Sequence, residues 1–149
     1  MDVQIDVSEN VRFIEKPSFL AVASKDGSYH KHICLLPRFK KRINNYAGRV
    51  PQIHAILVYC LIKDELKLYS SIQICNDVSR NKLMNCLRKL FKGNDSWTVL
   101  KIKIAPVKKS FVDSYVKRVR KSKEFGTIIK LDTILKHLNF LERKNKDRH

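Results

Sequence analysis

The chain has 149 residues, of which 44% are hydrophobic and 30% charged. This length suits one ordinary domain with its own core, and the recurring apolar runs exclude a disordered basic tail. Its 31 Lys and Arg residues stand against 14 Asp and Glu residues, which leaves a formal net charge of +17. Residues 101–149 hold 15 of the basic and 5 of the acidic residues. Such a surplus repels itself unless a polyanion neutralises it, so nucleic acid is the expected partner.

Hydropathy and cysteine usage predict an intracellular, cytoplasmic protein with no membrane partner. The longest strongly apolar run, residues 53–62, is shorter than the roughly 20 residues that a membrane-spanning helix needs. The N-terminal residues lack the basic and apolar regions of a secretory signal. The cysteines form no closely spaced pair of the kind that binds zinc, so we expect reduced thiols. They are Cys34, Cys60, Cys75 and Cys86.

The first quarter of the chain predicts three strands. Residues 3–7 and 19–24 are rich in branched and small side chains, and residues 29–35 follow the turn sequence KDGS. The Asp-Gly pair in that turn suits the positive dihedral angles of a tight hairpin. We therefore expect residues 19–35 to form a β-hairpin.

The middle of the chain predicts one helix and two further strands. An apolar stripe at helical spacing runs over residues 37–47 and ends at Gly48 and Pro51. Residues 53–62 form a continuous apolar run, which is typical of a central strand buried on both faces. A turn then leads to a second strand over residues 66–75.

The following segment predicts a strand–helix–strand crossover. Asp77 or Ser79 can cap a helix whose apolar stripe covers residues 83–91. Residues 97–104 alternate between apolar and polar side chains, as in an edge strand with one wet, basic face. A parallel pairing between the two flanking strands is therefore possible.

Two amphipathic helices are predicted near the C-terminus. The first covers residues 112–119, and the second covers residues 131–141 with Asp132 as its cap. Residues 142–149 read as a charged, frayed tail.

This order of elements predicts the α/β class. Strands interleaved with helices indicate a single layered domain over residues 1–141, with a mixed sheet flanked by helices. An alternative stays open for residues 29–104. They can also be read as strand, helix, strand, strand, helix, strand, which is the ferredoxin-like α+β order of many RNA-binding domains.

Asp6 is the strongest candidate for chemistry because it stands inside an apolar first strand, in the sequence VQIDVSE. A first strand that carries an Asp, followed by a hairpin, a helix and a further strand, resembles the start of a ribonuclease H-like fold. The resemblance covers residues 1–104. In that superfamily the first-strand Asp binds a divalent metal. A second carboxylate comes from the next helix or a neighbouring strand, and another comes from a C-terminal helix.

The resemblance implies a set of catalytic carboxylates for Mg²⁺ or Mn²⁺: Asp6, Asp64, Glu65, Asp113 and Asp132. Asp64 or Glu65 would supply the second position, and Asp113 or Asp132 would supply the last. The implied metal ligands are Asp6, Asp64 and Asp132. Two hard cations prefer oxygen ligands and can clamp the attacking water and the leaving oxygen of a phosphodiester. Turn and capping roles remain the simpler alternatives for Asp64, Glu65 and Asp132.

Three basic stripes are candidates for contact with nucleic acid. The stripes are Arg38, Lys40, Lys41, Arg42 and Arg49; Lys101, Lys103, Lys108 and Lys109; and Lys117, Arg118, Arg120, Lys121 and Lys123. A single charge run is usually a solvated face, but three in one small domain favour binding to phosphates. The chain contains no Gly-rich phosphate loop and no zinc-finger spacing.

These patterns leave three functions open. The first is a metal-dependent nuclease that acts on RNA or DNA phosphodiesters. The second is a non-catalytic RNA- or DNA-binding module without a cofactor. The third is a subunit of a ribonucleoprotein or other protein complex.

Overall fold

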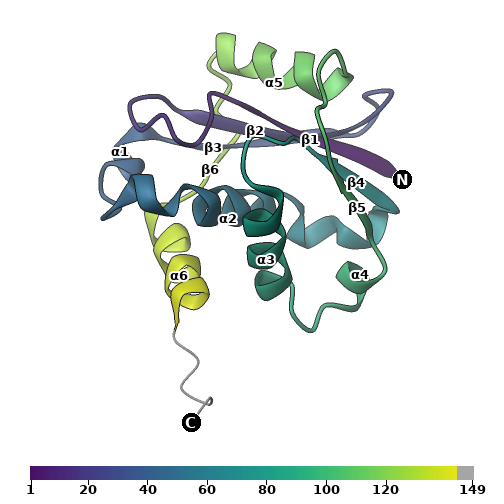
Figure 1. Ribbon diagram of the computed structural model, residues 1–149. Coiled ribbons are helices and arrows are strands. Elements are labelled where there is room, and N and C mark those ends of the chain that lie inside the picture. Colours follow the sequence, from purple (N-terminus) through teal and green to yellow (C-terminus); the bar gives the residue numbers. More distant parts are fainter. Residues whose placement is uncertain (144–149) are drawn as a thin grey trace.

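The computed structural model describes residues 1–143 and is built around a mixed six-stranded sheet (Figure 1). The strands are β1 (Asp2–Ser8), β2 (Ser18–Ser24), β3 (His30–Leu35), β4 (Ser71–Ile74), β5 (Lys101–Ile104) and β6 (Thr127–Ile128). Their order across the sheet is β5-β4-β1-β2-β3-β6. Strands β1, β2 and β3 are antiparallel, whereas β4 runs parallel to β1, β5 runs parallel to β4, and β6 runs parallel to β3.

Helices cover both faces of this sheet. They are α1 (Pro37–Lys40), η1 (Tyr46–Arg49), α2 (Val50–Ile62), η2 (Lys63–Leu68), α3 (Arg80–Leu90), α4 (Asp95–Thr98), α5 (Phe111–Lys121) and α6 (Leu131–Glu142). Helices α2, α3 and α6 lie on one face, and α5 lies on the other (Figure 1). The expected α/β class, with a mixed sheet flanked by helices, is confirmed.

Each face of the sheet has its own apolar core. On the α2 side, alternate residues of the strands, such as Ile5 and Ile74, pack with α2, α3 and α6. On the α5 side, the smaller residues Ala21 and Ala23 of β2 pack against Val112 and Val116 of α5. The small side chains allow α5 to approach the sheet closely, above β1 and β2.

The predicted hairpin is confirmed. Every residue of β2 is buried, which accounts for its small and branched composition. In the turn, Gly27 adopts a φ of 79°, a conformation that glycine accepts without strain. The Asp26 carboxylate accepts hydrogen bonds from the backbone N–H of Ser28 at 3.0 Å and from the hydroxyl of Ser24 at 2.8 Å.

The prediction that residues 53–62 form a central strand is wrong, because this segment belongs to helix α2. Eight of its residues are buried, His54 among them. A helix enclosed by a sheet and two other helices is apolar on all sides, so its sequence shows no amphipathic period and resembles a buried strand. Pro51 stands in the first turn of α2 and does not end a preceding helix.

Three other predicted segments are shorter than expected. The helix over residues 37–47 is limited to α1, and the chain reverses at Asn45 with a φ of 50°. The strand over residues 66–75 begins only at Ser71, after η2. The strand expected over residues 97–104 begins only at Lys101, because Trp97 lies in α4. The backbone N–H of Trp97 donates a hydrogen bond to the side chain of Asn94 at 3.1 Å, which caps this short helix.

The crossover from β4 through α3 to β5 is confirmed, with β4 and β5 parallel and β5 at the sheet edge. The ferredoxin-like alternative is wrong, since residues 29–104 hold three strands and not four. The predicted helices at 112–119 and 131–141 are α5 and α6, whose N-cap positions are Ser110 and Lys130. Asp132 is therefore not the cap of α6, and β6 was not predicted.

Helix α6 extends to Glu142, so the first residue of the predicted tail is helical. Residues 144–149, the rest of that tail, lie outside the described residues. Among the helices of residues 1–143, none combines the length and the apolar character that crossing a membrane requires.

Candidate metal centre

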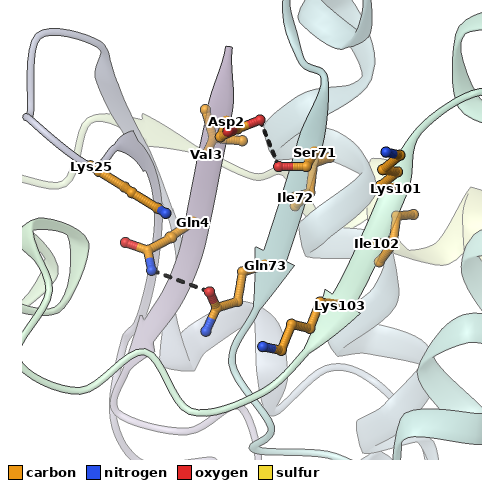
Figure 2. Close-up of a pocket in the computed structure, with 10 residues that line it drawn as sticks. All are labelled: Asp2, Val3, Gln4, Lys25, Ser71, Ile72, Gln73, Lys101, Ile102 and Lys103. Atoms are coloured by element: carbon orange, nitrogen blue, oxygen red, sulfur yellow. Dashed lines mark hydrogen bonds between the residues drawn. The ribbon is translucent and has the colours of Figure 1, made fainter.

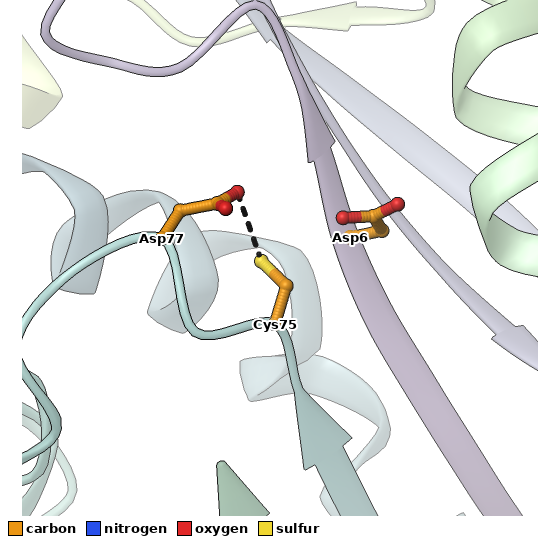
Figure 3. A group of neighbouring side chains, drawn as sticks. All are labelled: Asp6, Cys75 and Asp77. Carbon is orange, nitrogen blue, oxygen red and sulfur yellow. Dashed lines mark hydrogen bonds between the residues drawn. The ribbon is translucent and has the colours of Figure 1, made fainter. Parts of the chain in front are cut away.

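Two acidic residues meet where β4 ends beside the parallel strand β1. The register of these strands pairs Ile5 with Ile74, so Asp6 and Cys75 are the next residues on adjacent strands. Asp77 follows two positions later, in the loop that leaves β4. One ligand atom each from Asp6, Cys75 and Asp77 lies within 4.8 Å of the others (Figure 3).

A third carboxylate comes from α5. The Ser110 hydroxyl caps this helix by accepting a hydrogen bond from the N–H of Asp113 at 3.3 Å. This places Asp113 in the first turn, on the face that covers β1. The Asp113 carboxyl group lies within hydrogen-bond reach of Asp6 and lines the same pocket as Asp6 and Asp77. We call Asp6, Asp77 and Asp113 the carboxylate cluster.

The environment of the cluster separates the pKa values of Asp6 and Asp113. Asp6 is only 8% exposed. Burial, the hydrogen bond with Asp113, and the charges of Asp113 and Asp77 raise the pKa of Asp6 from 3.8 to about 7. For Asp113, burial alone would raise the pKa, but hydrogen bonds from the Lys109 amide, from Asp6 and from Lys117 lower it below its ordinary value. Near neutral pH, Asp6 is therefore poised between its acid and its carboxylate.

Lysines surround the cluster. The carboxylate of Asp113 accepts from the backbone N–H of Lys109 at 3.1 Å and from the Lys117 ammonium at 3.4 Å. The cluster opens into a pocket of about 450 Å³ whose rim also carries the exposed residue Lys108. A pocket lined by both carboxylates and ammonium groups suits a ligand that combines a metal cation with a polyanion.

The donor set fits a hard divalent cation. Carboxylate oxygens are the ligands that Mg²⁺ and Mn²⁺ prefer. Burial and the nearby Asp77 and Asp6 raise the pKa of the Cys75 thiol well above its ordinary value, so this sulfur is protonated and donates to Asp77 at 3.4 Å. A protonated thiol is a poor metal ligand. Burial is the main cause of the raised pKa of Asp6, and the charges of Asp113 and Asp77 add to it; a bound cation would favour the ionised carboxylate.

The structure brings together two of the predicted acidic residues, Asp6 and Asp113. The structure does not bring Asp64 or Glu65, the residues expected at the second position, to this cluster. Both residues lie in η2, which precedes β4, and they are therefore near the opposite end of β4 from Cys75 and Asp77. Glu65 accepts a hydrogen bond from Lys31 at 2.6 Å, and the Asp64 side chain is 78% exposed beside Lys63.

Asp132 does not join the cluster either. It is exposed in the first turn of α6, on the face of the sheet opposite α5 (Figure 1). The residue that completes the cluster is Asp77, which the sequence suggested only as a helix cap. Helix α3 begins at Arg80 and receives no side-chain cap. The missed signal was the position of Asp77 directly after a strand that could pair in parallel with the first strand.

The basic stripes separate into exposed and structurally engaged residues. Lys40 is completely buried and donates to Phe13 O, Lys16 O and the Ser18 hydroxyl at 2.7–2.9 Å, so its predicted role in nucleic-acid contact is wrong. Arg49 and Arg120 are half-buried in ion pairs with Glu142 and Glu9. The remaining basic candidates are exposed: Arg38, Lys41, Arg42, Lys101, Lys103, Lys108, Lys109, Lys117, Arg118, Lys121 and Lys123.

Comparisons with protein-family models, with curated proteins and with solved structures give no match for this chain.

Proposed function

We propose that this protein is a divalent-metal-dependent nuclease that hydrolyses phosphodiester bonds of RNA or DNA. The convergence of Asp6, Asp77 and Asp113 in one lysine-rimmed pocket carries the proposal. Asp6 is a buried carboxylate, which is costly to place beside other negative charges, and the chain has only 14 acidic residues in all. The net charge of +17 supports a polyanionic substrate.

The origin of the three carboxylates supports a ribonuclease H-like architecture. Asp6 comes from the first strand, and Asp77 comes from the end of β4, the strand that pairs with β1. Asp113 comes from α5, a helix late in the chain. These are the positions from which the resemblance draws its metal ligands: the first strand, a neighbouring strand and a C-terminal helix.

The chemistry follows from the charges in the pocket. Bound Mg²⁺ or Mn²⁺ would supply a Lewis acid and lower the pKa of a coordinated water. Asp6 and Asp113 would hold the cation only after Asp6 loses its proton, so the cluster is competent on the alkaline side of the pKa of Asp6. Lys108, Lys109 and Lys117 would bind phosphate oxygens and orient the scissile group.

The test is a cleavage assay with matched substitutions. Asp6→Asn, Asp77→Asn and Asp113→Asn should each lower Mg²⁺- or Mn²⁺-dependent cleavage by at least about a hundredfold, the scale expected when transition-state stabilisation by a metal ligand is lost. Asp64→Asn and Asp132→Asn are the controls and should cleave like the wild type. The substrates are single-stranded and duplex DNA, duplex RNA and an RNA–DNA hybrid. Absence of cleavage on all of them, or cleavage that survives Asp6→Asn, would refute the proposal.

A second function, non-catalytic nucleic-acid binding, draws on a separate observation. Lys101 and Lys103 are exposed on the edge strand β5, and they could bind phosphates whether or not the cluster is catalytic. In that case the protein would act as an RNA-binding module or as a subunit of a ribonucleoprotein complex. Salt-dependent binding by a wild-type protein that never cleaves would favour this alternative.

A further inference from the structure

Helix α5 covers only part of its side of the sheet. It packs against β1 and β2, whereas β4 and β5 direct polar side chains outward on the same side (Figures 1 and 2). These side chains line a shallow depression of about 220 Å³. We call the polar residues of this depression other than Asp2 the open sheet face: Gln4, Lys25, Ser71, Gln73, Lys101 and Lys103.

The strand registers align this surface with the carboxylate cluster. Gln4 pairs with Gln73, and Gln73 pairs with Lys103, so these three side chains form one row across β1, β4 and β5. The Gln4 amide donates to Gln73 at 3.4 Å within this row (Figure 2). Gln4 lies two residues before Asp6 and therefore on the same face of β1. The open sheet face and the cluster are thus neighbouring parts of one surface.

The chain that follows β5 leads from the open sheet face to the pocket of the carboxylate cluster. After Lys103 the chain reaches Pro106, whose carbonyl accepts a hydrogen bond from Gln73 at 2.9 Å. Lys108 and Lys109 follow on the rim of the pocket. Lys101 lies four residues before Ala105, the position next to Ile74 at the end of β4. At roughly 3.3 Å per strand residue, the distance from Lys101 to Ala105 is about 13 Å. This length corresponds to about four base steps along one strand of a duplex.

The chemistry of the open sheet face suits a sugar–phosphate backbone. Three lysines and two amides face solvent there, and Lys25 reaches from the β2–β3 turn toward Gln4 (Figure 2). The one carboxylate in the depression, Asp2, accepts a hydrogen bond from Ser71 at 2.7 Å. None of the ten residues that line the depression is aromatic. Proteins that bind single strands without sequence preference rely on aromatic side chains on which the bases stack. The open sheet face therefore favours contact with the backbone of paired strands.

We propose that the open sheet face binds the backbone of duplex nucleic acid and directs one of its strands to the carboxylate cluster. The inference rests on the proposed function, because it names the substrate class and the path of the substrate. It predicts tighter binding of a duplex than of a single strand, with little dependence on base sequence.

Binding is measured without cleavage, in EDTA, with all variants built on Asp6→Asn. The sheet-face variant combines Lys25→Gln, Lys101→Gln and Lys103→Gln. The matched control changes three exposed lysines in α3 and directly after it to Gln: Lys82, Lys89 and Lys92. Helix α3 lies on the opposite face of the sheet (Figure 1). Fluorescence anisotropy then gives the affinity for labelled duplex DNA, duplex RNA, hybrid and single-stranded DNA over a range of salt concentrations.

The sheet-face variant should lose at least about tenfold in duplex affinity, and its slope of log affinity against log salt should become shallower by about 2.7, or about 0.9 for each lost phosphate contact. The α3 control should retain the affinity and slope of its parent. The inference is overturned if the sheet-face variant binds like its parent, if the α3 control loses as much, or if single strands bind more tightly than every duplex.

These outcomes are separable from those of the proposed function. A wild-type protein that never cleaves, while the sheet-face variant alone loses duplex binding, refutes the nuclease and retains the binding surface. Metal-dependent cleavage that Asp6→Asn abolishes, together with unchanged binding by the sheet-face variant, retains the nuclease and refutes the surface.

Discussion

Replacing Asp6 with Asn should make the metal-free protein more stable while it abolishes metal-dependent cleavage. The neutral Asn has the shape of the protonated Asp. Its oxygen can accept the hydrogen bond that the Val7 N–H now donates to Asp6 at 2.9 Å, and its amide can donate to Asp113. The substitution therefore removes the buried charge and keeps both hydrogen bonds.

The size and pH dependence of this effect follow from the raised pKa of Asp6. The pKa rises from 3.8 to about 7 in the folded state, and each unit corresponds to about 1.4 kcal/mol. Ionising Asp6 at pH 8 therefore costs the fold on the order of 4 kcal/mol, whereas below pH 3.8 it costs nothing because the group is protonated in both states. The contribution of protonated Asp6 to the free energy of unfolding is therefore fully present at low pH and is lost as the pH rises through about 7.

Urea unfolding in EDTA at pH 4, 6 and 8 measures this difference. The free energy of unfolding of Asp6→Asn should exceed that of the wild type by a margin that is near zero at pH 4 and reaches about 2–4 kcal/mol at pH 8. Asp132→Asn, at an exposed position, is the control and should show no such trend. A margin that does not change with pH, or a variant less stable than the wild type at pH 8, would refute the reasoning.

Three further predictions concern the cluster and two buried residues. Mg²⁺ should raise the melting temperature of the wild type more at pH 8 than at pH 6, because the cation must displace the proton on Asp6. In Asp6→Asn, Mg²⁺ should hardly change the melting temperature. Calorimetry measures these shifts, and equal stabilisation of the wild type at both pH values would contradict the prediction. Burial lowers the pKa of His54 from 6.5 to about 4. The free energy of unfolding of the wild type should therefore fall by about 3 kcal/mol relative to that of His54→Leu as the pH decreases from 6.5 to 4. Parallel profiles of unfolding free energy against pH for the two proteins would contradict this prediction. Lys40→Ala should lower the free energy of unfolding by about 3 kcal/mol or more, because it leaves the acceptors Phe13 O and Ser18 Oγ unpaired. Urea unfolding measures this loss. The control Lys41→Ala, at an exposed neighbouring position, should change the free energy of unfolding by less than about 1 kcal/mol.

Local sequence patterns were sufficient where an element has one polar face or where a turn signal bounds it. The hairpin of β2 and β3, the helices α3, α5 and α6, and the crossover from β4 to β5 all carry a period or a turn signal within a few residues. Helix α2 could not be recognised in this way. It is buried on all sides, and a period that separates helix from strand exists only where polar and apolar faces alternate.

The candidate site was predictable in part for the same reason. Asp6 attracts attention because a carboxylate inside an apolar strand is unusual, and the surplus of lysine and arginine indicates a polyanionic partner from composition alone. The choice of Asp77 and Asp113 over Asp64 and Asp132 depended on long-range pairing. Once the segment before β4 is a helix, Asp64 lies ahead of the strand and Asp77 lies beyond its end.

Composition and local period thus establish the charge, the class and most of the elements of this protein. The register of β1 against β4 and the docking of α5 onto β1 establish which carboxylates share a pocket. Those contacts join residues about 70 and more than 100 positions apart, and they arise from the burial of two apolar faces of one sheet, which no short stretch of sequence encodes.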